Sequence, residues 1–211
     1  MAKEAARRGG EPRNYPKGER RRTQIIEAAF AAFGQVGYRN VSMLQLAAAC
    51  GVSGAGLLHH FPTKESLLEA VLAQRELKDD ELFFRSGIDP TDGLEYFANM
   101  LRLVAHNQAN PLIVSLFAVL SSEATAADHP AHPFFVARYE CARSQMQSAI
   151  DDLASRGLLQ PHVVASSLAA NLIAMIDGLQ VQWLLAPSAI DMPQHLRGML
   201  SALLTVDLPE A

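Results

Sequence analysis

Apolar residues recur at helical spacing along most of the chain. Between Arg20 and Val36 they lie three and four positions apart, so they share one face of a helix. Gly37 follows, in the position where left-handed backbone angles commonly end a helix. We find no convincing run of alternating apolar and polar residues, which is the pattern of a half-buried strand. The sequence therefore predicts an all-α fold.

Two short helices are predicted between residues 42 and 61. Ser42 can cap the first of them, with Gln45 three residues later completing a capping box. Gly51 supplies a turn, and Ser53 can cap the second helix. This is helix-turn-helix geometry, in which the second helix enters the major groove of DNA. A purely structural helical hairpin stays open, because such hairpins are common in all-α domains.

The rest of the chain predicts a second helical unit, with boundaries marked mainly by prolines. Helices are expected at about 64–84, 91–108, 111–124, 132–156, 161–186 and 192–206. Asn171 and Asp177 interrupt the longest apolar region, which argues against a membrane span.

The predicted helix at 161–186 carries small residues at a spacing of four, which allow a second helix to approach closely. Two such helices per subunit, with the apolar stripe of the last helix, would form a four-helix bundle across a two-fold axis. Packing within one chain would use the same faces, and this alternative stays open. The interface candidates are Ser166, Ala170, Ala174, Gly178, Leu196, Leu200 and Leu203.

Charge is distributed unevenly along the 211 residues. The first 22 contain eight basic and three acidic residues, a net charge of +5, whereas the whole chain carries −4. A basic arm on an acidic body is typical of proteins that bind nucleic acid or an acidic membrane, although it also fits a solubilising tail. The only cysteines are Cys50 and Cys141, and no apolar secretory segment follows the basic residues. We therefore expect a cytoplasmic protein.

Lys64 lies in the first turn of its predicted helix, where the helix dipole disfavours a cation. A phosphate beside that helix end would bind both the ammonium group and the free backbone N–H groups. His59 is also placed to face a phosphate, whereas His60 is expected to cap or pack. A solvated surface lysine is the plain alternative.

Residues 23–72 resemble the DNA-binding domain of the TetR family of transcriptional regulators. The most specific matches are Phe33 with Gly37-Tyr38, Ser42, Leu46-Ala47, Gly51-Val52-Ser53 and the segment from His60 to Leu67. The resemblance implies a flexible basic arm at 1–16, a helix-turn-helix domain at 17–75 and a ligand-binding and dimerisation domain at 76–211. It implies a repressor-like homodimer that binds a palindromic operator in double-stranded DNA.

The resemblance and the basic residues together give the expected DNA contacts. They are Arg20, Arg21, Arg22, Thr23, Ser42, Ser53, Gly54, Ala55, Gly56, His59 and Lys64. Many family members carry a lysine or arginine where this chain has Gly54, and a tyrosine where it has Leu58. Because Gly54, Ala55 and Gly56 offer no side-chain hydrogen bonds, we expect few direct contacts with base edges. Contacts with phosphates should therefore supply more of the affinity for DNA.

The resemblance also implies an effector cavity among the middle helices. Most aromatic and methionine side chains there should form ordinary core, but some would line the cavity and favour a largely apolar effector. The lining candidates are Phe97, Met100, Leu101, Val104, Phe117, Phe135, Tyr139, Asn171 and Met175. The polar candidates are His106, Gln108, Asn171, Asp177 and Gln180.

Two other classes of function would fit parts of the sequence. A helical binding or scaffold protein could use the basic arm on partners other than DNA. A metal-dependent enzyme would need ligands such as His129 and His132, yet two prolines lie near them and no cysteine does. Catalytic and phosphate-loop motifs are lacking in the sequence, so we expect neither an enzyme nor a bound cofactor.

Overall fold

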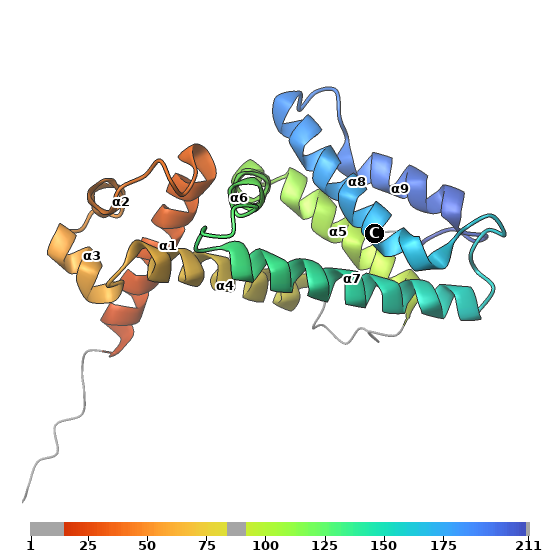
Figure 1. Ribbon diagram of the computed structural model, residues 1–211, viewed down its shortest axis with the longest axis horizontal. Helices are drawn as coiled ribbons and strands as arrows, with labels where there is room; N and C mark the ends of the chain where they lie inside the picture. Colours follow the sequence, from red (N-terminus) through yellow and green to blue (C-terminus); the bar gives the residue numbers. More distant parts are fainter. Residues whose placement is uncertain (1–14, 84–91, 210–211) are drawn as a thin grey trace, which may run out of the picture.

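A computed structural model of the chain describes residues 15–83 and 92–209, with side chains from residue 18 onward. Within these ranges the regular elements are all helices, so the all-α prediction is confirmed (Figure 1). They are α1 (Tyr15–Val36), α2 (Met43–Ala49), α3 (Gly54–His60), α4 (Lys64–Phe83), α5 (Gly93–Gln108), α6 (Pro111–Glu123), α7 (His132–Ser155), α8 (Ala165–Leu185) and α9 (Met192–Leu203). The predicted basic arm lies outside the described residues except for its last two.

Three helix boundaries differ from the sequence prediction by three residues or more. Helix α1 begins five residues before Arg20, and α8 begins at Ala165 instead of 161. Helix α9 ends at Leu203 instead of 206. The last two differences share a cause, because the backbone before α8 pairs with the end of α9. Gln160 N donates to Leu203 O at 2.8 Å, and Leu159 and Leu204 form an antiparallel bridge.

Local interactions build the N-terminal helices as the sequence predicts. Ser42 Oγ accepts from Gln45 N at 3.3 Å, and Gln45 Oε1 accepts from Ser42 N at 2.8 Å, so the capping box is confirmed. Ser53 Oγ caps α3 by accepting from Gly56 N at 3.0 Å. Gly37 (φ +82°) and Gly51 (φ +61°) hold the left-handed backbone angles that the turns after α1 and α2 require.

Helix α6 joins the two parts of the molecule. Figure 1 shows it between α1–α3 at one end and α8–α9 at the other. Its Leu116 and Leu120 are fully buried in the same core as α1–α4. Ser115 Oγ donates to Gly34 O, and Gly34 lets the backbones approach closely, since a Cβ there would lie 3.1 Å from Leu112 O. A movement of α6 would therefore displace α1 as well.

A second core forms between α5, α7, α8 and α9. Helix α8 is long and apolar enough to cross a membrane, but one side of it belongs to this core. Its buried residues are Leu168, Ala169, Leu172, Leu179 and Trp183. Packing within the chain thus accounts for the large apolar residues on one side of α8.

Replacing Gly93 with alanine is expected to destabilise the second core. A Cβ at Gly93 would lie 2.6 Å from Leu153 Cγ and would also overlap Ala149 O, so α5 and α7 would have to separate. Overpacking of this kind costs about 2 kcal/mol, and the expected fall in Tm is roughly 4–8 °C for a chain of this size. Gly18→Ala, where a Cβ meets open space within α1, is the control and should not lower Tm in the same thermal unfolding experiment. An unchanged Tm for Gly93→Ala would contradict the expected clash.

Candidate nucleic-acid interface and interior cavity

Helix α3 and its capping residue Ser53 form the exposed tip of the helix-turn-helix. Ser53, Gly54, Ala55 and His59 are exposed, and Gly56 is half-buried. The structure also leaves Ser42 exposed at the start of α2. Ser53 Oγ accepts a backbone N–H as a helix cap, which leaves its hydroxyl proton for an outside acceptor such as a phosphate oxygen. The sequence-predicted residues of the helix-turn-helix are therefore brought to the surface.

Two leucines on the same unit were not predicted as site residues. Leu44 of α2 is 76% exposed and Leu58 of α3 is 49% exposed. Both lie off the buried face of their helices, and that position in the apolar pattern could have identified them. Apolar side chains of this kind can contact thymine methyl groups in the major groove.

The basic residues of α1 lie beside this unit. Arg20, Arg21 and Arg22 are exposed, and the Arg22 guanidinium lies 4.9 Å from the centroid of the Phe61 ring at the end of α3. Arg21 Nη2 donates to Gly51 O in the turn at 3.5 Å. Thr23 is exposed, and its hydroxyl donates to Glu19 O at 3.1 Å. The positive charge of α1 is thus fixed next to the helix-turn-helix.

Lys64 begins α4 and is held against Tyr38. Its Nζ lies 4.2 Å from the centroid of the Tyr38 ring, an arrangement that favours a cation. Burial lowers the pKa of the Lys64 ammonium group, while Glu65 and Glu123 raise it. Tyr38 Oη donates to Glu65 Oε1 at 2.8 Å, and together with the backbone N–H of Glu65 this bond lowers the pKa of the Glu65 carboxyl group.

Tyr38 also links the N-terminal unit to the end of α6. Glu123 Oε2 accepts from Tyr38 N at 3.0 Å and lies 3.5 Å from Nε2 of the buried His129. Burial lowers the pKa of His129, and its Nδ1 accepts from Ala131 N. His132 Nδ1 contacts Ala124 O at 2.8 Å. Both histidines thus shape the turn before α7, and no cluster of three or more metal-ligating side chains occurs in residues 15–83 and 92–209.

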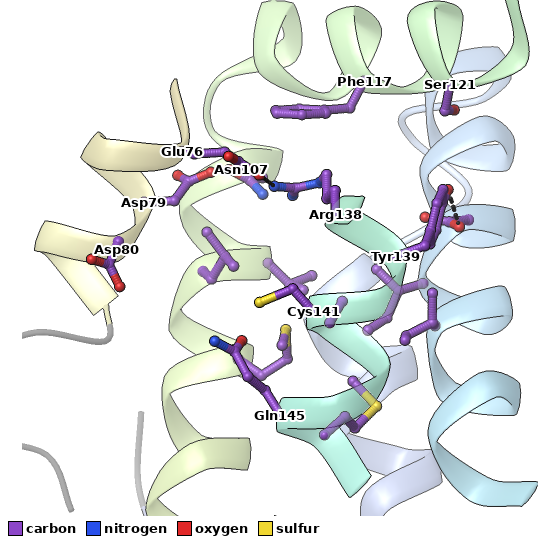
Figure 2. Close-up of a pocket in the computed structure, with 18 of the residues that line it drawn as sticks. Glu76, Asp79, Asp80, Asn107, Phe117, Ser121, Arg138, Tyr139, Cys141 and Gln145 are labelled. Atoms are coloured by element: carbon purple, nitrogen blue, oxygen red, sulfur yellow. Dashed lines mark hydrogen bonds and ion pairs between the residues drawn. The ribbon is translucent and has the colours of Figure 1, made fainter. Parts of the chain in front are cut away.

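A cavity of about 640 Å³ lies between α4, α5, α6, α7 and α8 (Figure 2). Five of the nine predicted ligand-binding residues line it, and the list comprises Met100, Val104, Phe117, Phe135 and Tyr139. The lining side chains Leu77 and Cys141 are exposed, so the cavity reaches the surface between α4 and α7.

The other four predicted residues do not line the cavity. Phe97 and Leu101 each directly follow a residue of α5 that lines the cavity, so they lie on the adjacent side of the helix. Both are buried in the second core instead. Met175 packs against that core, and Asn171 is exposed on the far side of α8. The helical period groups residues into faces, but it does not say which face meets the cavity.

The cavity wall carries charged residues that the sequence analysis did not single out. Arg138 Nη1 donates to Glu76 Oε1 at 3.0 Å, and its guanidinium lies 4.4 Å from the Phe117 ring centroid. These residues come from α4 and α7, whose mixed polar pattern resembles that of a solvated helix. Of the polar candidates, Asp177 and Gln180 line the cavity, whereas Gln108 Oε1 accepts from Met192 N and the His106 ring packs against Phe83.

The outer face of α8 is formed by small residues. Ser166, Ala170 and Ala174 are exposed, and a Cβ at Gly178 would meet open space. On α9 the prediction is wrong for Leu196 and Leu200, which are buried in the second core, and Leu203 packs against it too. The apolar stripe of α9 packs within the chain, so the opposite side of α9 is exposed to solvent. That surface includes Gly198, Met199, Ser201 and Ala202.

Comparisons with known proteins match both parts of the chain. Residues 25–71 match the family of bacterial regulatory proteins of the TetR type, and residues 100–205 match the C-terminal domain of BetI-type transcriptional repressors. The regulator BetI of Stenotrophomonas maltophilia is 30% identical over 164 residues, which cover 75% of this chain and 79% of BetI. The chain belongs to the TetR family.

TetR-family regulators resemble this chain to different extents. UidR of Escherichia coli is 30% identical over 83 residues, so the match spans 39% of this chain and only 40% of UidR. A solved structure with the same fold is that of NalD, the secondary repressor of a multidrug efflux pump in Pseudomonas aeruginosa. It matches this chain with a TM-score of 0.70 and 25% sequence identity, and the match covers 90% of this chain and 98% of NalD. The TetR family consists of transcriptional regulators, which sets the enzyme alternative aside.

Proposed function

We propose that this protein is a transcriptional repressor that binds a palindromic operator as a homodimer and is released by a small effector. One observation carries the proposal. The same chain holds an exposed helix-turn-helix tip and a cavity of about 640 Å³, and α4 and α6 both line the cavity and pack in the core of the N-terminal unit. Such a regulator would act in the cytoplasm, where the operator lies.

Most of the affinity for DNA is assigned to phosphates. Gly54, Ala55 and Gly56 supply only backbone and methyl surface, so base readout relies on Ser42, Ser53 and apolar contacts. The phosphate contacts are assigned to Arg20, Arg21, Arg22, Thr23, His59 and Lys64, of which all but Lys64 are exposed. Binding is therefore expected to weaken steeply as salt concentration rises.

The cavity is proposed as the effector site, and the outer faces of α8 and α9 as the dimer interface. The cavity is large enough for a drug-sized molecule and has several aromatic residues in its wall. The small residues of α8 have no packing partner within the described chain that accounts for them, as the open space at Gly178 shows most directly.

Selection of bound duplexes from a random pool tests the operator proposal. The selected sequences should contain two inverted half-sites, with centres about one helical turn, roughly 34–36 Å, apart. A pool without enrichment at physiological salt would contradict sequence-specific DNA binding and favour the scaffold alternative.

Lys64→Ala is expected to weaken binding by a similar factor on all selected duplexes and to reduce the salt slope by about one unit. The reason is that a phosphate contact carries no sequence information. Lys78→Ala, an exposed lysine farther along α4, is the matched control and should leave affinity and slope unchanged. Both are measured by fluorescence anisotropy at several salt concentrations. A change of preferred base at one position would instead make Lys64 a base reader.

A further inference from the structure

Asp177 is an unusual residue for its helix. It is the only charged residue of α8, and its half-buried side chain lies in the cavity wall. Its carboxylate accepts a hydrogen bond from Tyr139 Oη at 2.8 Å, which Figure 2 marks with a dashed line. Among the described residues no lysine, arginine or histidine lies within ion-pair distance of it. Burial raises the pKa of the Asp177 carboxyl group, while the Tyr139 hydrogen bond and the positive charge of Arg138 lower it.

Two other carboxylates in the wall, Asp79 and Glu76, each form an ion pair with an arginine. The Asp79 carboxylate is buried against the Arg75 guanidinium on the same helix. Among the described residues Arg138 is the only basic residue in the cavity wall, and it forms an ion pair with Glu76 and lies over the Phe117 ring. An anionic ligand would compete with Glu76 for Arg138, whereas a cationic ligand would find at Asp177 a carboxylate that has no ion-pair partner among the described residues.

The surroundings of Asp177 suit an apolar body with a positive end. The Phe135 ring lies 6.3 Å from Phe117 and 6.5 Å from Tyr139, measured between ring centroids. Ile173 and Ile176 lie beside Asp177 on the same wall of the cavity. Aromatic faces attract cations, and a desolvated carboxylate gains most from a charge-assisted hydrogen bond.

We propose that the cavity binds an organic ammonium ion with an apolar body, and that Asp177 receives its positive charge while the aromatic residues cover its body. This molecule is the effector if the function proposed above holds, but its binding does not require DNA.

Three probes with one body and three charges test this proposal. They are 4-phenylbutylamine, 4-phenylbutanol and 4-phenylbutanoate, titrated by calorimetry into the full chain without DNA. The amine should bind about tenfold or more tightly than the alcohol, because its ammonium group adds a charge–charge attraction to the hydrogen bond that both probes can donate to the Asp177 carboxylate. The carboxylate should bind most weakly. Equal affinity for amine and alcohol, a preference for the carboxylate, or no binding of any probe at millimolar concentration would overturn the proposal.

Asp177→Asn separates charge from shape, since an asparagine oxygen can still accept from Tyr139. The variant should lose most of the preference for the amine while its affinity for the alcohol changes less than about threefold. Asp151→Asn, at an exposed carboxylate of α7 outside the cavity, is the control and should keep the full preference. Thermal unfolding of both variants checks that they fold. Equal loss of all three probes in Asp177→Asn would mean that the residue only shapes the cavity. A result that contradicts the ammonium proposal would not contradict the proposed repressor function, because operator binding is measured separately on DNA.

Discussion

Replacing Ala174 with arginine is expected to split the proposed dimer. Ala174 lies in the middle of the small-residue face of α8, between Ala170 and Gly178, where two helices could pack closely. A guanidinium placed there would be buried without a partner, which costs several kcal/mol. The dissociation constant should rise by about a hundredfold or more, since each 1.4 kcal/mol is a factor of ten.

Loss of the dimer should also weaken the binding of operator DNA. A monomer reaches one half-site, so Ala174→Arg should also lose most of its affinity for the two-half-site operator and keep weak binding to a single half-site. Sedimentation equilibrium and anisotropy measure the two effects. Ala137→Arg, at an exposed alanine of α7, is the matched control and should stay dimeric. A wild-type protein that sediments as a monomer at micromolar concentration would contradict the dimer itself.

The exposed apolar side chains near the same face support this choice of position. Leu185 at the end of α8 is 81% exposed, and Val181 and Met199 are exposed as well. Val181 and Leu185 follow Gly178 at helical spacing on α8, so a partner surface on this face would cover them too. Exposed apolar surface of this kind is typical of a protein–protein interface.

An effector in the cavity is expected to weaken operator binding by about 5- to 150-fold, the range of a coupling free energy of 1–3 kcal/mol. By thermodynamic reciprocity, saturating operator must weaken effector binding by the same factor. The measurement is a titration of effector, identified by its release of operator, with and without DNA. Equal affinities in both would show that the ligand is not an inducer and would leave a co-repressor or structural role for the cavity.

Two helices offer a physical route for this coupling. Helix α4 carries Lys64 at its start and cavity residues farther along, and the Phe83 ring at its far end lies 5.4 Å from the His106 ring of α5. Phe84, the next residue along the chain, lies outside the described residues. A ligand that moves this end would tilt α4 and change the separation of the two recognition helices in a dimer.

Helix α6 provides the second route. Phe117 and Ser121 line the cavity. Two residues after Ser121, the Glu123 carboxylate accepts a hydrogen bond from Tyr38 N, and the Tyr38 ring lies against Lys64. Glu123→Ala should therefore reduce the coupling factor several-fold while each ligand alone still binds. An unchanged coupling factor in that variant would assign the transmission to α4.

The sequence by itself determined the local structure of the helix-turn-helix. Capping by Ser42 with Gln45, the cap at Ser53 and the turns at Gly37 and Gly51 each depend on residues within four positions of one another, so the order of residues specifies them. The same local signals, together with the prolines, located nearly all later helices to within a few residues.

Only the tertiary structure decided which helix faces meet which neighbours. Met100 and Val104 line the cavity while Phe97 and Leu101 fill the core, although all four are apolar residues of one helix. The apolar stripe of α9 is likewise used inside the chain, which turns Met199 outward. Helical spacing groups side chains into faces, but the partner of each face is set by contacts between residues far apart in the chain. The position of Asp177 beside Tyr139 depends on such a contact, 38 residues apart in the sequence.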